Sequence, residues 1–131
     1  MPNLNAWAPR VLSLLRIIAA LLFMEHGLMK LFSFPAAQPG VPHPLPMILT
    51  VAAVIEVAGG ALLTVGLFTR LAAFICAGEM AAAYFLFHAK QRMWPGVNGG
   101  DAAILFCWVF FYLVFAGGGA WSVDALVRKK A

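Results

Sequence analysis

Four long apolar segments constrain the fold of this chain more than any motif does. They cover about residues 10–33, 45–68, 70–89 and 100–118. A membrane-spanning helix needs about 20 mostly apolar residues, so each segment is long enough to cross a bilayer. The chain is 63% hydrophobic and only 11% charged, whereas soluble domains contain roughly 25% charged residues. We therefore predict an all-α fold, an integral membrane four-helix bundle formed by residues 1–131 as a single domain.

The connections between these segments are short and rich in proline and glycine. Residues 38–44 contain three prolines, which interrupt helices, so this stretch is predicted to be a stiff, extended loop. Residues 66–70 leave room only for a tight hairpin, with Thr69 as the predicted N-cap of the third helix. Three consecutive glycines, at 117–119, are predicted to end the fourth helix.

The first apolar segment differs from a secretion signal because ionisable residues interrupt it. An uncharged signal-peptide core would not contain them, so we expect the segment to be retained as a helix. The interrupting residues are Arg16, Glu25, His26 and Lys30.

The distribution of basic residues predicts the orientation of the bundle. With four spans, both termini and the 66–70 hairpin share one side of the membrane. That side carries five basic residues, Arg10, Arg70, Arg128, Lys129 and Lys130, and the other carries three, Lys30, Lys90 and Arg92. By the positive-inside rule we predict a multi-pass membrane protein with both termini in the cytoplasm.

Three other classes of function are not expected. The net charge of +4 includes no basic run beyond residues 128–130, so nucleic-acid binding is not predicted. Cys76 and Cys107 form no CxxC motif and no metal-ligand spacing, so no metal site is predicted. Cys76 is expected about 9 Å from the inner face of the membrane and Cys107 about 9 Å from the outer face. The two cysteines are then about 12 Å apart along the membrane normal. A direct disulfide needs Cα atoms within about 7 Å, so dithiol chemistry is not expected either.

Charged residues inside the apolar segments carry the strongest indication of function. Each costs about 2.5–3.5 kcal/mol at the centre of a membrane helix, roughly 10–14 kcal/mol for four if they are unpaired. We therefore expect them to face one another or a wet cavity, or to be protonated. The four charged residues well inside the spans are Arg16, Glu25, Glu56 and Glu79.

Helix depth and helical periodicity place a polar site in the outer half of the bundle. Glu56 shares a face with Gly59 and Gly60, so a neighbouring backbone can approach its carboxylate closely. The predicted ligand-binding residues are Arg16, His26, Lys30, Glu56, Glu79, Asn98 and Asp101; the candidate catalytic residues among them are His26, Glu56, Glu79 and Asp101.

Each of these residues also has a structural interpretation that needs no ligand. Arg16 paired with Glu56 or Glu79 would be a buried ion pair that only fixes the helix register. The other residues have similar interpretations. Glu25, Lys30 and His88 could lie at the membrane interface. Asp101 could complement a helix dipole, and His26 could make an internal hydrogen bond.

The order of several short motifs resembles the DoxX family of small four-helix bacterial membrane proteins, over nearly the whole chain. Many relatives have glutamate where this chain has Asp101, which keeps the carboxylate and shortens its reach. The matching motifs are Arg16 with His26-Gly27-x-x-Lys30-Leu31, Glu56-x-x-Gly59-Gly60 with Gly66-Leu67-x-Thr69-Arg70, Asn98-x-Gly100-Asp101 with Tyr112-Leu113, and Gly117-x-Gly119-x-Trp121-Ser122-x-Asp124.

The resemblance implies a location in the bacterial inner membrane and a link to membrane redox systems. Members are associated with a thiosulfate:quinone oxidoreductase and with complexes that contain superoxide dismutase and a sulfurtransferase. The expected partners are therefore membrane lipids and a soluble oxidoreductase or sulfur-metabolism protein, and the expected cofactor is a quinone-like lipid between the helices. Haem ligated by His26 and His88 is a variant that we do not expect.

Two alternatives come from other classes of function. A small transporter or ion-conducting bundle would use the same charged groups as a relay, although 131 residues contain no inverted repeat of the kind transporters use. Homo-oligomerisation would supply the pathway that one chain lacks. A non-catalytic membrane scaffold for a soluble oxidoreductase would use its charged core only to fix helix register.

Overall fold

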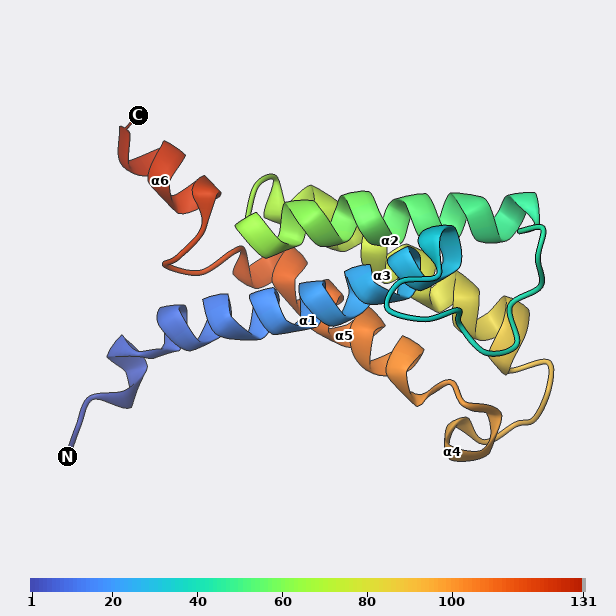
Figure 1. Cartoon of the computed structure of the whole chain (residues 1–131). Coiled ribbons are helices and arrows are strands. Elements are labelled where there is room, and N and C mark those ends of the chain that lie inside the picture. Colours follow the sequence, from blue (N-terminus) through green and yellow to red (C-terminus); the bar gives the residue numbers. More distant parts are fainter. Residues whose placement is uncertain (131) are drawn as a thin grey trace.

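Four apolar helices account for most of the chain, and Figure 1 shows their arrangement in a computed structural model. The structure describes residues 1–130, and over this range it contains helices, turns and loops but no β-strand. The elements are η1 (Leu4–Ala6), α1 (Ala8–Phe32), α2 (Met47–Val65), α3 (Thr69–Ala83), the π-helical segment η2 (Tyr84–His88) that extends α3, α4 (Pro95–Asn98), α5 (Asp101–Ala116) and α6 (Val123–Lys130). The predicted all-α membrane bundle is confirmed.

The helices lie close to the predicted spans, but the second and the last are shorter than predicted: α2 covers Met47–Val65 instead of 45–68, and α5 covers Asp101–Ala116 instead of 100–118. Three helices, α1, α2 and α3 with η2, are long and apolar enough to cross a membrane, with 25, 19 and 20 residues. Helix α5 has 16 residues, about 24 Å, which is shorter than a hydrocarbon core of about 30 Å. It ends at Gly117, where φ is +78°, so the predicted limit at residue 118 is two residues too long. Helices α4 and α6 were not predicted.

The bundle consists of two tightly packed helix pairs. Helix α1 packs mainly against α2, and α3 packs mainly against α5, while α2 and α3 touch less extensively. Phe23 on α1 and Phe110 on α5 are fully buried where the pairs meet, with ring centroids 4.9 Å apart in an edge-to-face contact. Large apolar side chains such as Ile18 and Phe74 point outward, as expected for surfaces that face lipid.

The close contact between α1 and α2 depends on Gly27. A Cβ atom at this position would lie 2.8 Å from the carbonyl oxygen of Ala53 and 2.9 Å from Cβ of Glu56. We expect Gly27→Ala to lower the free energy of unfolding by about 1–3 kcal/mol, because overpacking forces the backbones apart. SDS-driven unfolding in mixed micelles measures this change. Gly78→Ala is the matched control, since nothing lies within 4 Å of a Cβ there; equal stability of the two variants would contradict the prediction.

The two ends of the bundle differ in how polar groups are used. Both termini and the α2–α3 turn lie at one end, here called the terminal end, and the 33–46 loop and α4 lie at the other, here called the loop end (Figure 1). At the terminal end, charged side chains bind the backbone groups at helix ends. Arg70 donates from Nη1 to the carbonyl oxygens of Val114 and Phe115, at 2.7 and 2.5 Å, and so caps the C-terminus of α5.

Arg16 is the most deeply buried of these terminal-end residues, at 1% exposure. Its guanidinium donates to the carbonyl oxygens of Gly118, Trp121 and Thr64. The alternative in which Arg16 forms a buried ion pair with Glu56 or Glu79 is therefore wrong. Side chains on a helix lean toward its N-terminus, which carries the Arg16 guanidinium toward the terminal end and away from the centre of the bundle.

Asp124 on α6 caps helix α3 from outside that helix. Its carboxylate accepts hydrogen bonds from the backbone N–H groups of Phe68 and Thr69, both at 2.9 Å. The predicted N-cap, Thr69, is instead the first residue of α3, and the N-cap position is Phe68 in the left-handed conformation with φ of +50°. The correction follows from α6, which brings a carboxylate to a helix start that has no capping side chain of its own.

These hydrogen bonds predict a pH-dependent contribution of Asp124 to stability. Burial alone would raise the pKa of its carboxyl, but the hydrogen bonds from Thr69 and Phe68 and the charge of Arg128 lower this pKa below its ordinary value. The stabilisation is then complete above the unfolded pKa of about 3.9 and is lost as the pH falls through the lower folded pKa. We expect Asp124→Ala to cost about 1 kcal/mol at neutral pH.

Thermal unfolding of wild type and Asp124→Ala between acidic and neutral pH tests this prediction. The difference in Tm should narrow as the pH falls below about 4. Asp101→Ala is the control, because Asp101 is also an aspartate in the first turn of a helix but is exposed. A difference that stays constant down to the lowest pH would show that the carboxylate charge of Asp124 is not what stabilises α3.

Candidate functional site

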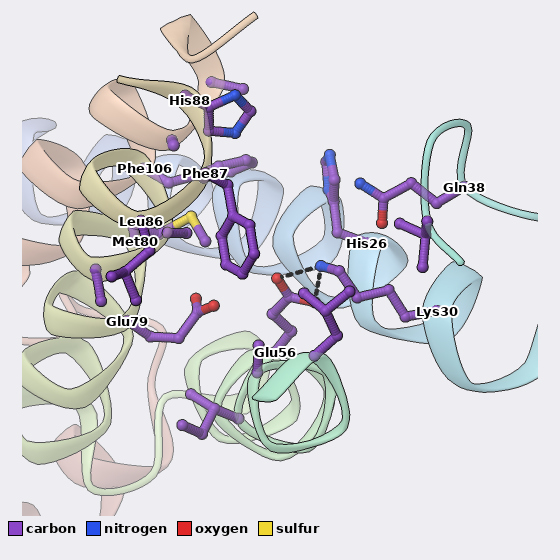
Figure 2. A pocket seen from close by; sticks show the side chains of 18 of the residues that line it. His26, Lys30, Gln38, Glu56, Glu79, Met80, Leu86, Phe87, His88 and Phe106 are labelled. Carbon is purple, nitrogen blue, oxygen red and sulfur yellow. Dashed lines mark hydrogen bonds and ion pairs between the residues drawn. The ribbon is translucent and has the colours of Figure 1, made fainter. Parts of the chain in front are cut away.

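A cavity of about 630 Å³ lies in the loop-end half of the bundle (Figure 2). Helices α1, α2, α3 and α5, segment η2 and residues 38–41 of the loop all contribute to its walls. Most of the lining is apolar, with a few convergent polar side chains. This combination of an apolar wall and a small polar group is typical of sites that bind small molecules. The ionisable residues that line it are His26, Lys30, Glu56, Glu79 and His88.

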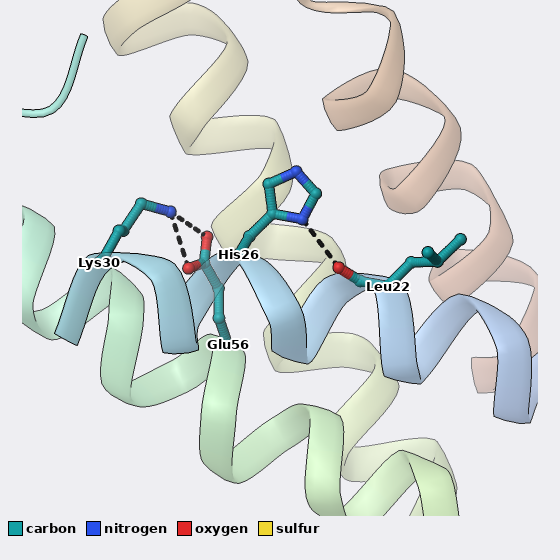
Figure 3. Close-up of polar contacts among 4 residues, drawn as sticks. All are labelled: Leu22, His26, Lys30 and Glu56. Atoms are coloured by element: carbon teal, nitrogen blue, oxygen red, sulfur yellow. Dashed lines mark hydrogen bonds and ion pairs between the residues drawn. The ribbon is translucent and has the colours of Figure 1, made fainter. Parts of the chain in front are cut away.

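An ion pair between α1 and α2 forms the polar wall of the cavity. Nζ of Lys30 lies 2.7 Å from both carboxylate oxygens of Glu56, and the two residues are only 9% and 2% exposed. Lys30 leans back toward the N-terminus of α1, and its ammonium group meets the Glu56 carboxylate (Figure 3). Gly27 lies next to Glu56, since a Cβ atom at Gly27 would be 2.9 Å from Cβ of Glu56. The alternative that Lys30 extends to the membrane interface is therefore wrong.

His26 lies one turn before Lys30 on the same helix and has a defined hydrogen-bonding direction. Its Nδ1 atom lies 2.8 Å from the carbonyl oxygen of Leu22 (Figure 3). A carbonyl oxygen only accepts, so Nδ1 must carry the hydrogen, and Nε2 of the neutral ring is left as an acceptor. The ring packs edge-on against Phe106, with centroids 5.9 Å apart, which holds it at the cavity wall.

Glu79 approaches the same cavity from α3, across from the ion pair (Figure 2). Its Oε2 atom is buried and has no hydrogen-bond partner in the structure. Lys30 already binds both oxygens of Glu56. A buried carboxyl oxygen without a partner is costly, so this position favours a ligand or an ordered water at Oε2.

The cavity also reaches the apolar surface of the bundle. Several of its lining residues are themselves exposed on the outside of α2, α3 and η2. The cavity therefore borders the lipid-facing surface along these elements, and an apolar molecule in the bilayer can meet it there. These exposed lining residues are Ile48, Val51, Ile75, Leu86 and Phe87.

Four of the seven residues predicted to bind a ligand are brought together in this cavity: His26, Lys30, Glu56 and Glu79. The other three lie elsewhere. Arg16 is at the terminal end, and Asp101 is exposed at the start of α5, where it complements the helix dipole. Asn98 is buried and closes the turn before α5, donating to the Arg92 carbonyl oxygen and accepting from the Gly100 N–H.

Three polar residues of the cavity were not predicted as ligand-binding: Gln38, His88 and Gln91. His88 was expected at the interface, but it lines the cavity, and its Nδ1 lies 3.1 Å from the carbonyl oxygen of Asn98. Gln38 comes from the proline-rich loop, and its Oε1 is buried without a partner. The run of prolines could have indicated that this loop contributes to the cavity, because a stiff connection after α1 must return across the loop end to reach α2.

Glu25, the remaining charged residue inside a predicted span, is half-buried and does not line the cavity. The two cysteines are free thiols, with Cys76 buried and Cys107 half-buried. None of these residues adds a reactive group to the cavity.

Comparisons with known proteins agree with the fold and with the motifs. The sequence profile of the DoxX family matches residues 11–89. An uncharacterized protein of Haemophilus influenzae is 44% identical over 135 residues, covering 99% of this chain and 100% of the relative. The inner membrane protein YqjF of Escherichia coli is 31% identical over 123 residues, covering 88% and 90% of the two chains. No solved structure matches the chain. The chain therefore belongs to the DoxX family of membrane proteins.

Proposed function

We propose that this protein is a component of a membrane redox system that binds a quinone-like lipid in the cavity between α1, α2, α3 and α5. The observation that carries the proposal is the composition of the cavity. Its outer part is apolar and opens toward the lipid-facing surface, and its inner wall holds an ion pair, a histidine and a carboxyl group. A quinone has the same division, with an apolar tail and two polar oxygens on a ring.

The volume of the cavity suits a ligand of this size. Sites for small molecules and cofactors have volumes of about 300–1,000 Å³, and this cavity measures about 630 Å³. Phe106 and Phe87 line it and supply flat apolar surfaces for a ring. A ligand that diffuses within the bilayer would reach it from the lipid-facing side of α2, α3 and η2 without crossing water.

The polar residues present fit the chemistry of a quinone head group. A bound quinone would supply reversible two-electron transfer, with a proton taken up or released at each oxygen. Glu79 has a buried oxygen without a partner, and His26 has a free ring nitrogen, so each can hold or exchange a proton at a ligand oxygen. The Lys30 ammonium, with two of its hydrogens directed to Glu56, has a third to donate.

Titration of the purified protein in nanodiscs with a short-chain ubiquinone analogue tests the proposal by calorimetry. We expect saturable binding that weakens in His26→Ala and in Glu79→Leu. His43→Ala is the matched control, because His43 lies in the exposed loop outside the cavity. Binding that is equal in wild type and in both cavity variants would reject this site, and the absence of binding to wild type would reject the proposed function.

We further propose that both termini face the cytoplasm, which places the cavity toward the periplasmic half of the inner membrane. At the loop end, Lys30 is neutralised by Glu56, which leaves Lys90 and Arg92 against five basic residues at the terminal end. A soluble oxidoreductase or sulfur-metabolism protein would then exchange electrons with the bound quinone. Reporter fusions at the C-terminus test the orientation: fluorescent GFP is expected, and active alkaline phosphatase would contradict it.

A further inference from the structure

The free polar atoms of the cavity are mainly hydrogen-bond acceptors. His26 and His88 both direct Nδ1 to a backbone carbonyl oxygen, of Leu22 at 2.8 Å and of Asn98 at 3.1 Å. Because a carbonyl oxygen only accepts, Nδ1 carries the hydrogen in both rings, and Nε2 of each neutral ring has only a lone pair to offer. Two imidazoles that line one cavity are thus held in the same tautomer by the backbone.

Glu79 adds a further acceptor on the opposite wall. Its buried Oε2 has no partner, and a carboxyl group keeps acceptor sites in either protonation state. Gln38 and Gln91, which also line the cavity, do not discriminate between ligands, because rotation of an amide presents either its oxygen or its NH₂ group. The Lys30 ammonium is the one strong donor at the wall, and two of its three hydrogens are directed to Glu56.

From this arrangement we infer that the cavity selects a ligand that donates hydrogen bonds, namely the reduced quinol form of the quinone-like lipid. The inference rests on the proposed function and adds the redox form that the site prefers. A quinol ring has two hydroxyl groups, which can donate to His26, His88 or Glu79, while a hydroxyl oxygen accepts from Lys30. A quinone has only carbonyl oxygens, so it leaves the imidazole Nε2 atoms without a partner, and buried acceptors without partners oppose binding.

Preference for the reduced form changes the potential of the bound lipid. By linkage, a site that binds quinol more tightly than quinone makes the bound quinone easier to reduce than the quinone in the membrane. Each tenfold difference in affinity raises the midpoint potential of this two-electron couple by about 30 mV. The cavity would therefore act as an acceptor for electrons delivered by a partner, and the reduced lipid would be the tightly held species.

Binding of three matched ligands to the intact protein in nanodiscs tests the inference, under anaerobic conditions that keep the quinol reduced. The ligands are an alkylated hydroquinone, the corresponding quinone, and the hydroquinone dimethyl ether, which has the same ring and no hydrogen to donate. We expect the hydroquinone to bind about tenfold or more tightly than the other two, as two additional hydrogen bonds would give. In His26→Phe this preference should fall to a few-fold, while His43→Phe keeps it.

The outcomes separate the inference from the function on which it rests. A quinone that binds as tightly as the hydroquinone, or more tightly, overturns the inference and leaves the quinone site in place. A dimethyl ether that binds as tightly as the hydroquinone also overturns it, because shape and apolar contact would then explain affinity. If none of the three ligands binds to wild type, both the inference and the proposed function fail. The comparison among ligands uses the wild-type protein, so it does not depend on whether a variant folds.

Discussion

Lys30→Met is expected to lower the free energy of unfolding by about 3–5 kcal/mol, because it leaves the Glu56 carboxylate buried without its partner. Glu56 is only 2% exposed, and Lys30 donates to both of its oxygens at 2.7 Å. Methionine keeps the unbranched shape of the lysine side chain, so the loss reports the charge rather than a cavity. SDS-driven unfolding in mixed micelles, followed by tryptophan fluorescence, measures this change.

A double variant separates the pair from the individual residues. Lys30→Met combined with Glu56→Gln removes both charges, and we expect it to recover most of the lost stability, because a buried pair replaced by neutral groups is often close to neutral in energy. Lys90→Met is the matched control, since Lys90 is exposed at the same end of the bundle. A double variant as unstable as Lys30→Met alone would show that the loss comes from packing and not from an unpaired carboxylate.

Arg16→Met is expected to cost about 3 kcal/mol or more, because three backbone carbonyl oxygens lose a charged donor inside the protein. These carbonyls belong to Gly118, Trp121 and Thr64, so a single side chain holds the C-terminus of α2 and the segment between α5 and α6. Arg16→Lys should recover only part of the loss, since an ammonium group cannot reproduce the fork of the guanidinium.

Unfolding in mixed micelles measures these losses, and ligand binding by the same variants tests whether the two ends of the bundle are independent. We expect quinone-analogue binding to be retained under conditions in which Arg16→Lys remains folded, because Arg16 does not line the cavity. Arg92→Met is the control for loss of an exposed arginine. An Arg16→Lys protein that is as stable as wild type but unable to bind the ligand would return Arg16 to the ligand site and contradict its structural role.

Hydrophobicity and length were sufficient to predict the helices but not their ends. The spans follow from apolar runs that no soluble fold could bury, and this argument is independent of tertiary contacts. Helix α6 was not predicted, because its eight residues, with three basic side chains at the C-terminal end, contain no long apolar run. The N-cap at Thr69 failed for a related reason: the capping carboxylate of Asp124 is 55 residues away in sequence, where local patterns do not reach.

The candidate site was predictable where helical periodicity is regular. Lys30 and Gly27 lie on one face of α1, and Gly59 and Gly60 lie beside Glu56, so these positions are consistent with a close contact between α1 and α2. His88 was expected at the interface from its depth alone, without regard to the direction of its side chain. Residues Tyr84–His88 form a π-helix, with the Ala89 N–H donating to the Tyr84 carbonyl oxygen at 2.9 Å. An extra residue in one turn rotates every later side chain by about 100° relative to a regular α-helix.

Which cation meets which carboxylate depended on side-chain direction rather than on depth alone. Arg16 and Lys30 share a stripe of α1, and both lean toward the N-terminus of that helix. For Lys30 this direction leads to Glu56, and for Arg16 it leads away from both glutamates. Distances along the helix axis, taken from Cα positions only, place Arg16 closer to the carboxylates than its guanidinium actually is.

Mass spectrometry of the lipids retained by the protein, purified gently from its native membrane, tests the central claim most directly. We predict that a quinone or quinol is enriched over the bulk lipid extract, and that Ala52→Phe, which fills the cavity from α2, removes it. Ala61→Phe is the matched control, because Ala61 is exposed on the same helix and does not line the cavity. A visible spectrum of the same sample would reveal haem. Two results would contradict the account: wild type that retains only bulk phospholipid, or Ala52→Phe and Ala61→Phe variants that retain quinone equally.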